Sequence, residues 1–280
     1  YATREGIKVF IGERGDKAVR KYNKFIPKQK EGYFLRIQPK EIVLAGNDEQ
    51  GTFYALQTLE QLLKDNQLPV ADITDYPEIT FRGVVEGFYG APWSHEARLR
   101  HLKFYGQNKM NTYIYGPKDD PYHSSPNWRL PYPEQEAKQI KELVQIAKEN
   151  AVNFVWAIHP GKDIKWNQED RDNLLGKFQK MYELGVRSFA VFFDDISGEG
   201  TNPDRQAELL NYIDEQFVKV KKDVTPLIMC PTEYNKSWSN VKGGYLTTLG
   251  TKLNPRIHIM WTGDRVIADM YEGDTEKGGM

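Results

Sequence analysis

The chain has 280 residues, which is enough for one large domain or two unequal ones. Its formal net charge of -1, with 28% charged residues, predicts neither a nucleic-acid-binding surface nor an acidic tail. No apolar stretch approaches the ~18 residues of a membrane span, and a single cysteine, Cys230, excludes an internal disulfide. The five histidines are scattered, with no pair at metal-binding helical spacing, so we expect no metal and no other cofactor.

Residues 1–78 predict a small α/β domain at the start of the chain. Strand-like runs at 7–11, 32–37 and 41–46 precede a helix at 52–64, in which Phe53, Leu56 and Leu59 share an apolar side. Pro69 and the sequence DYP at 75–77 are typical of a linker. Because Tyr1 is not an initiator, we expect a processed chain that has lost any export signal.

From residue 79 onward, strands and helices alternate, which is typical of βα units around a parallel sheet. One helix is expected at 134–148 and another through 209–217. Strands are expected at 81–85, 112–115, 154–158, 189–193, 227–230 and 257–261. The pattern predicts an α/β fold in which 79–267 form a TIM-type (β/α) barrel with about six of its eight strands. Residues 268–280 are expected to be a flexible tail.

Asp194 and Asp195 follow the apolar run FAVFF at 189–193, where a buried parallel strand should end. Active sites of α/β barrels lie at the carboxyl ends of their strands, and neighbouring residues on a strand point to opposite faces. Two adjacent acids can therefore divide proton transfer from electrostatic work. The alternatives are a helix cap or turn, with Asn202 and Asp204 nearby as further caps, and a Mg²⁺ or Ca²⁺ site.

Other polar residues follow neighbouring strands. Tyr234 offers a phenol, Lys118 a cation, and Gly87 a backbone carbonyl that no side chain obstructs. Each has an ordinary alternative, in packing, solvation or a turn. Aromatic residues make up 12% of the chain, which fits either sugar binding or an aromatic core.

Four segments together resemble family 84 of the glycoside hydrolases, the family of O-GlcNAcases and related β-N-acetylglucosaminidases. They are RGVVEGFYG at 82–90, residues 111–118, FFDDI at 192–196 and MCPTEY at 229–234. The likeness is greatest to the gut-Bacteroides type, and residues 51–59 resemble the small α/β domain that precedes such barrels.

The resemblance implies a retaining, substrate-assisted hydrolysis of β-linked GlcNAc from Ser or Thr of glycoproteins through an oxazoline intermediate. It implies that Asp194 orients the 2-acetamido group and that Asp195 is the general acid and base. It also implies that Tyr234 binds the acetamido oxygen. The substrate-binding residues that it implies are Gly87, Lys118, Cys230, Trp261 and Thr262. For Cys230, an inert buried thiol is an equal alternative.

The family continues with two further strands, and nothing after Trp261 matches them. We therefore expect a fragment, a redesigned chain, or a chain whose missing strands a second polypeptide supplies. Alternative functions are a non-catalytic GlcNAc-binding or scaffold module, a hyaluronidase-like activity on GlcNAc-containing glycans, and a metal-dependent hydrolase. By analogy with the family, the protein would be an exported bacterial one. No nucleic acid or membrane partner is expected.

Overall fold

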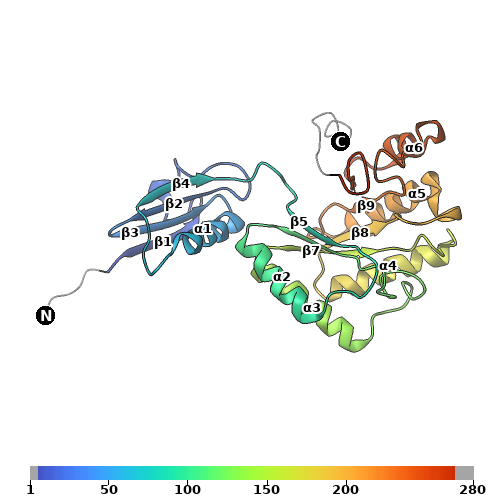
Figure 1. The fold of residues 1–280 in the computed structure, drawn as a ribbon, viewed down its shortest axis with the longest axis horizontal. Coiled ribbons are helices and arrows are strands. Elements are labelled where there is room, and N and C mark those ends of the chain that lie inside the picture. Colours follow the sequence, from blue (N-terminus) through green and yellow to red (C-terminus); the bar gives the residue numbers. More distant parts are fainter. Residues whose placement is uncertain (1–5, 269–280) are drawn as a thin grey trace. The chain divides into compact units, whose positions relative to one another are not determined.

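The computed structural model describes residues 6–268 (Figure 1). The chain divides into two compact units. Unit 1 comprises residues 1–83, 100–112 and 149–152, and unit 2 comprises residues 84–99, 113–148 and 153–280. The predicted tail at 268–280 lies, apart from Ala268, outside the described residues.

Unit 1 contains a four-stranded sheet of order β1-β3-β2-β4. β1 pairs parallel to β3, and β2 pairs antiparallel to both β3 and β4. The elements are β1 (Lys8–Glu13), β2 (Tyr33–Gln38), β3 (Glu41–Gly46), α1 (Glu49–Leu62) and β4 (Ala71–Asp75), with a short 3₁₀ turn at Arg20–Tyr22. The predicted small α/β arrangement is thus present in these residues.

Two apolar clusters cover the two faces of this sheet. Leu35 and Leu44 pack with Tyr54 of α1 on one face, while Phe34 and Val43 pack under the loop before β2 on the other. This division follows from strand alternation, because successive side chains point to opposite faces. The helix begins before the predicted residue 52, since the carboxylate of Asp48 caps it and accepts a hydrogen bond from the backbone N–H of Gly51 at 2.8 Å.

The expected linker before residue 78 is partly wrong. Residues Ala71–Asp75 form β4, an edge strand whose side chains are half-buried or exposed. Such a strand needs few apolar residues, because only one of its edges is paired and little of it is covered. Its polar sequence therefore did not indicate a strand.

The second sheet has six strands in the order β10-β9-β8-β7-β6-β5 (Figure 1). The pairs β7–β8, β8–β9 and β9–β10 are parallel. The strands are β5 (Gly83–Glu86), β6 (Thr112–Tyr115), β7 (Asn153–Ile158), β8 (Ser188–Phe192), β9 (Ile228–Cys230) and β10 (His258–Ile259). The curled sheet has six of the eight strands of a TIM-type barrel, as the sequence predicts.

Helices alternate with these strands. They are α2 (His95–Gln107), α3 (Glu134–Glu149), α4 (Gln168–Glu183), α5 (Pro203–Ile213) and α6 (Tyr245–Lys252), with short turns at Gly198–Thr201, Asp214–Val218 and Val241–Gly243. Individual ends differ from the predicted ones by one to a few residues. The predicted helix through 209–217 is α5 continued by one π-helical turn at Asp214–Val218.

The two faces of β8 have different neighbours. Ala190 and Phe192 face an apolar cluster that also contains Cys230, while Phe189 stacks on Phe178 of α4 with ring centroids 4.7 Å apart. Both faces are buried, which explains the unbroken apolar run in the sequence. The aromatic content thus contributes to the core of this unit.

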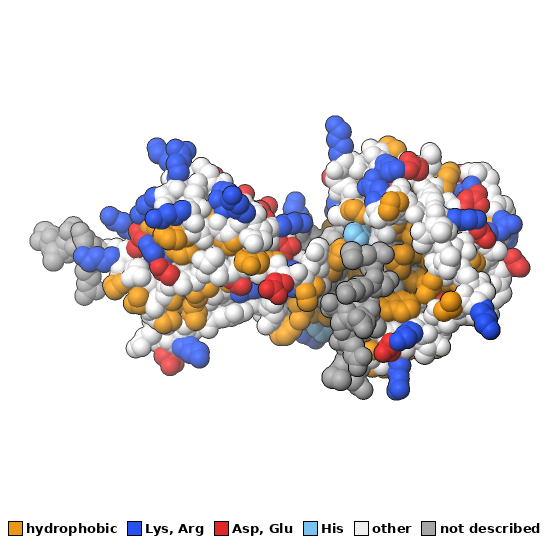
Figure 2. All heavy atoms as spheres, turned by 90° about the horizontal axis from the view of Figure 1, so that it is seen from above, with side chains coloured by type: hydrophobic (Ala, Val, Ile, Leu, Met, Phe, Trp, Pro, Cys, Tyr) orange, Lys and Arg blue, Asp and Glu red, His pale blue; other side chains and the backbone are white. Residues whose placement is uncertain are grey.

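Acidic and basic side chains are interspersed over the face seen in Figure 2, in keeping with the small net charge. None of the helices within residues 6–268 combines the length and the apolarity needed to cross a bilayer.

Candidate active site

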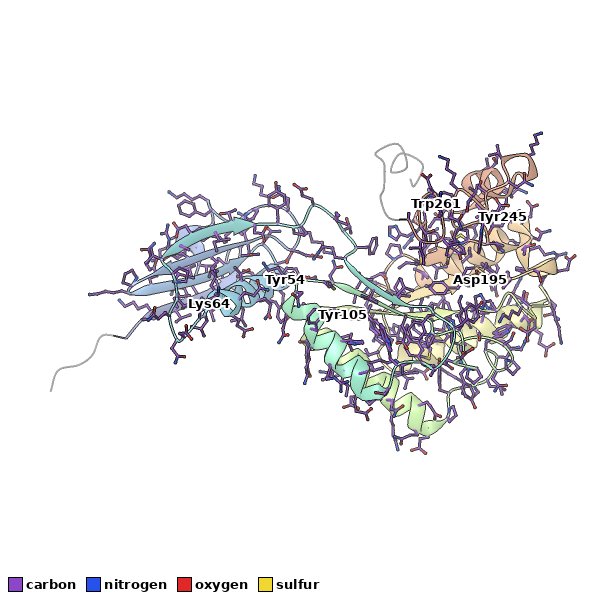
Figure 3. All side chains as sticks on the ribbon, viewed as in Figure 1. Tyr54, Lys64, Tyr105, Asp195, Tyr245 and Trp261 are labelled. Carbon is purple, nitrogen blue, oxygen red and sulfur yellow. The ribbon has the colours of Figure 1, made fainter. Side chains whose placement is uncertain are left out.

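Asp194 and Asp195 lie in the turn that follows β8, and Asp195 is labelled in Figure 3. The strand ends at Phe192, and Asp195 has a left-handed backbone with φ 54°. The expectation that strand alternation separates the two side chains is therefore wrong, because neither acid is on the strand. The nearby helix cap is Asn202, at the start of α5, as the sequence indicates for this segment.

The carboxylate of Asp194 is held by a buried cation. Lys118 Nζ lies 2.6 Å from Asp194 Oδ2, and the side chains are 1% and 15% exposed, respectively. Asp194 Oδ1 accepts no hydrogen bond from the residues that the structure describes. Oδ2 is thus fixed by the ion pair, while Oδ1 can still accept a hydrogen bond.

The main chain of Asp194 is held by His159, which is fully buried after β7. His159 Nε2 donates to the Asp194 carbonyl oxygen at 2.7 Å and lies 3.6 Å from Oδ1. Burial and the nearby charge of Lys118 lower the pKa of His159 to about 4. The imidazole is consequently neutral at pH 7.

Two phenols lie near Asp195. Tyr234 donates a hydrogen bond to Asp195 Oδ1 at 3.3 Å, and burial together with the charge of Asp195 raises the pKa of Tyr234 well above its ordinary value. Tyr89 is half exposed, and burial with the charges of Asp195 and Asp194 raises its pKa to about 12. Both phenols therefore keep their protons at neutral pH.

A buried network ties the loops after β8 and β9 together. Gln206 of α5 donates to the Gly200 carbonyl at 2.8 Å and to Thr232 Oγ1 at 2.9 Å. Thr232 Oγ1 in turn donates to the Phe193 carbonyl at 2.8 Å, and the Tyr245 hydroxyl donates to Gln206 Oε1. Since every member is paired, this network fixes the backbone immediately before the two acids.

Gly87 and Lys118 lie in neighbouring loops. Gly87 follows β5, and the backbone N–H of Lys118 donates to the carbonyl of Phe88 at 3.2 Å. Glu86, just before Gly87, is fully buried and is held by Arg98, whose Nη2 lies 2.7 Å from it. The start of this loop is therefore anchored by a buried ion pair.

The other predicted residues follow β9 and β10. Cys230 ends β9, and burial and the charge of Asp194 raise its thiol pKa well above the ordinary value, so the thiol is neutral. The backbone N–H of Thr262 donates to the Tyr234 carbonyl at 3.0 Å. Trp261, labelled in Figure 3, precedes Thr262 and is half-buried.

His159, Tyr89 and Gln206 are not among the site residues that the sequence predicts. The first two stand in strand-end loops, at 159–162 and 87–90, and this position is the signal that could have identified them. Gln206 lies on a helix and carries no such signal. Its role depends on packing that a single sequence does not encode locally.

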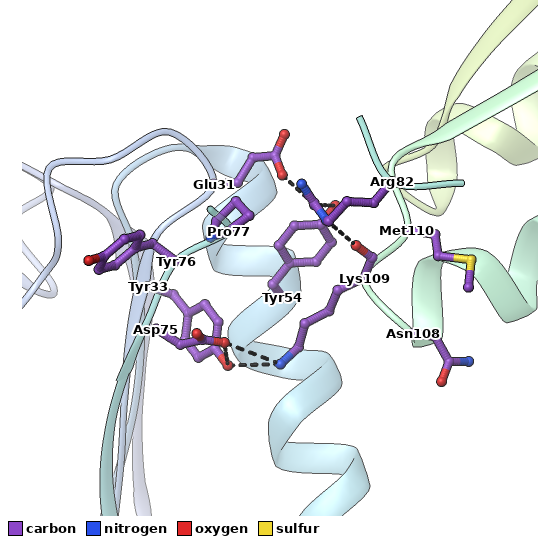
Figure 4. A pocket seen from close by; sticks show the side chains of 10 residues that line it. All are labelled: Glu31, Tyr33, Tyr54, Asp75, Tyr76, Pro77, Arg82, Asn108, Lys109 and Met110. Carbon is purple, nitrogen blue, oxygen red and sulfur yellow. Dashed lines mark hydrogen bonds and ion pairs between the residues drawn. The ribbon is translucent and has the colours of Figure 1, made fainter. Parts of the chain in front are cut away.

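A cavity of about 330 Å³ is lined only by residues of unit 1, and none of them belongs to the set described above (Figure 4). Its charged groups pair with one another: Arg82 Nη2 lies 2.5 Å from Glu31 Oε2, and Lys109 Nζ lies 3.7 Å from Asp75 Oδ2. These pairs satisfy the lining without a ligand. It contains no residue from a predicted strand-end motif, apart from Arg82 at the start of 82–90, so the chemistry is better placed at the Asp pair.

Around the acids, the structure assembles two carboxylates, two protonated phenols, a buried ammonium and a neutral imidazole. Such a set suits proton transfer and the stabilisation of a cationic intermediate. Within residues 6–268, no three His, Cys, Asp or Glu side chains gather as a metal site would require.

Comparison with known proteins gives two family matches. Residues 82–277 match the model of the β-N-acetylglucosaminidases, and residues 9–76 match the model of the second domain of glycosyl hydrolase family 20. Protein O-GlcNAcase from Rattus norvegicus is 36% identical over 195 residues, which are 66% of this chain and 21% of the relative.

Solved structures give the same grouping. CpGH84B superposes with a TM-score of 0.84 at 44% identity, over 89% of this chain and 46% of the other. An O-GlcNAc hydrolase mutant from Thermobaculum terrenum superposes with a TM-score of 0.65 at 32% identity, over 71% and 44%. The chain thus spans about a fifth of the curated relative and less than half of either structure.

Proposed function

Because the chain belongs to the β-N-acetylglucosaminidases of glycoside hydrolase family 84, we propose that it removes β-linked GlcNAc from Ser and Thr side chains of glycoproteins. The observation that carries this proposal is the Asp pair after β8, with Asp194 fixed by Lys118 and Asp195 by Tyr234. The retaining, substrate-assisted course is the one expected of the family.

Asp194 would orient the 2-acetamido group of the sugar. Its Oδ2 is bound to Lys118, and Oδ1, which is buried and has no hydrogen-bond partner among the described residues, would accept the acetamido N–H. The acetamido carbonyl oxygen then attacks C1 while the bond from C1 to the leaving oxygen breaks, which gives a protonated oxazoline (oxazolinium) ring. The positive charge that develops on this ring would be stabilised by the neighbouring carboxylate.

Asp195 would act first as the acid and then as the base. It gives its proton to the leaving oxygen, and later takes a proton from the water that attacks C1 and opens the oxazoline. Tyr234, which keeps its proton at neutral pH, would donate to the acetamido oxygen and hold it in line with C1.

The remaining predicted residues would bind the sugar. Gly87 and Lys118 would contact its hydroxyls from the loops after β5 and β6. The neutral thiol of Cys230 suits an acetyl-methyl pocket, with Thr262 and Trp261 next to it. The alternative of an inert thiol predicts that Cys230→Ala leaves KM unchanged.

Aryl β-GlcNAc substrates with a good and a poor leaving group test the proposal. Asp194→Asn should depress turnover of both, whereas Asp195→Asn should lose turnover mainly of the poor one, by ~100-fold or more. Asp204→Asn, at a half-exposed acid on α5, is the matched control and should act like the wild type. Binding of GlcNAc without turnover would favour a non-catalytic module, and loss of activity in excess chelator would favour a metal-dependent hydrolase.

We further propose a domain division at residues 78–79, supported by the family matches to 9–76 and 82–277. The edges of the six-stranded sheet, β5 and β10, would pair with further strands from the same or a second polypeptide, as edge strands tend to do. By family analogy, the protein would be an exported bacterial one. Limited proteolysis between residues 76 and 82 tests the first of these proposals.

A further inference from the structure

Within the described residues, His159 makes no hydrogen bond or ion pair with Asp195, yet it is bound to the peptide that joins the two acids. Its Nε2 lies 2.7 Å from the carbonyl oxygen of Asp194. A carbonyl only accepts, so Nε2 carries the proton and the tautomer is defined. We infer that His159 is a positioning residue, which sets the direction of the Asp195 carboxyl by holding this peptide plane.

Both the backbone and the ring of His159 contact His123. The backbone N–H of His159 donates to the carbonyl of His123 at 2.9 Å, and the two rings stack with centroids 6.1 Å apart and planes at 15°. His123 is fully buried, and its Nδ1 donates to the carbonyl of Ala157 at 2.6 Å. Two neutral, stacked rings in fixed tautomers therefore connect β7 to the turn after β8.

The geometry explains why a contact to Asp194 acts on Asp195. The carbonyl oxygen of Asp194 and the backbone nitrogen of Asp195 belong to the same planar peptide group. The φ of Asp195 is measured from that plane, and at 54° it lies in a region that residues other than glycine seldom occupy. Releasing the carbonyl lets the turn relax, which would swing the Asp195 side chain away from Tyr234.

Lys118 and His159 thus have separate tasks. Lys118 binds the side chain of Asp194 at 2.6 Å, whereas His159 binds its main chain. Loss of Lys118 should impair the acetamido-orienting acid, and loss of His159 should impair the proton-transferring acid. The catalytic part of this inference rests on the proposed glycosidase function, but the hydrogen bond does not.

The first test concerns the hydrogen bond and needs no substrate. The protein with ¹⁵N-labelled histidine has five imidazoles, and His159→Gln identifies the signal of His159 by its disappearance. We expect this ring to be neutral at pH 7, with the proton on Nε2, and to titrate near 4. A proton on Nδ1 at pH 7 would overturn the inference, whatever the protein catalyses.

The second test compares His159→Leu, which removes the donor, with His159→Gln, whose amide N–H keeps a donor at similar reach. The Leu variant should lose ~10-fold or more in kcat on an aryl β-GlcNAc with a poor leaving group, a part of what a general acid contributes. The kcat of the Leu variant on a substrate with a good leaving group should change little. His159→Gln should restore most of the wild-type ratio between the two kcat values. An equal loss on both substrates indicates a merely structural role and overturns the inference.

The Asp195→Asn background separates the two proposals. With the acid already removed, His159→Leu should no longer change the ratio between leaving groups, and a further change would contradict action through Asp195. A wild-type protein that cleaves neither substrate overturns the proposed function. In that case, the backbone amide chemical shifts of Asp195 test whether His159 positions this peptide. They should change in the Leu variant and stay unchanged in the Gln variant.

Discussion

Replacing Arg98 with methionine should destabilise unit 2 far more than breaking an exposed ion pair. Glu86 is fully buried at the end of β5, and Arg98 donates to both of its oxygens, from Nε at 2.9 Å and from Nη2 at 2.7 Å. The Tyr113 hydroxyl and the backbone N–H of Trp93 complete the set of donors. Arg98→Met leaves the carboxylate buried with two neutral donors among residues 6–268.

The expected loss follows from that geometry. Removing one partner of a buried ion pair costs about 3–5 kcal/mol, and the two remaining donors place Arg98→Met near the lower end. Lys138→Met is the matched control, because Lys138 and Glu134 form an i, i+4 pair with side chains 67% and 83% exposed. Breaking such a pair costs at most about 0.5 kcal/mol.

Urea unfolding followed by tryptophan fluorescence measures the difference. All six tryptophans lie in unit 2, so the signal reports that unit. Arg98→Met should lower the urea midpoint by roughly 1–2 M, given the usual dependence of unfolding free energy on urea. Glu86→Gln added to it should recover part of the loss. Equal midpoint shifts for Arg98→Met and Lys138→Met would refute the reasoning.

Two further predictions concern glycine and lysine. A Cβ on Gly200 would lie 2.0 Å from the Gly161 carbonyl oxygen, so Gly200→Ala should destabilise the fold. Gly176 lies on α4 with open space around it, so Gly176→Ala should stabilise the fold by up to about 1 kcal/mol. Thermal melts compare the two variants, and equal shifts of their melting temperatures would contradict the expectation. Burial lowers the pKa of Lys177 from 10.5 to about 7. Between pH 7 and 10.5 the amine is therefore protonated in the unfolded chain but neutral in the folded one, so the unfolding free energy should rise with pH across this window. Lys177→Met should flatten this rise in urea midpoints, and an unchanged slope would show that the buried amine is not its source.

Much of the architecture could be predicted because buried strands and helices show characteristic spacings of apolar residues in the sequence. The run at 189–193 indicated a strand covered on both faces, and the spacing at 134–148 indicated a one-sided helix; both are present. Lys118 and Tyr234 follow neighbouring strands, which predicted that they would lie near the Asp pair; Lys118 lies 2.6 Å from Asp194 and Tyr234 lies 3.3 Å from Asp195. Their catalytic roles remain predictions.

The features that could not be predicted, which are α2, β4 and the contact of His159, show little apolar periodicity. The helix α2 contains Arg98, whose stem and guanidinium are buried against a carboxylate, and such amphipathic residues do not register as core positions. The strand β4 is polar because it lies at an edge. His159 acts on a backbone carbonyl, a group that every residue carries, so no residue pattern reveals the pairing.

The left-handed backbone of Asp195 limits what substitutions at this position can report. At φ 54°, asparagine and aspartate are tolerated, whereas alanine or glutamate raises the energy of the turn by roughly 1–2 kcal/mol. A variant library at residue 195 would therefore rank side chains by turn propensity as well as by acidity. Asparagine is the replacement that separates the two, and an alanine scan of this loop would overstate the chemical contribution of the carboxyl group.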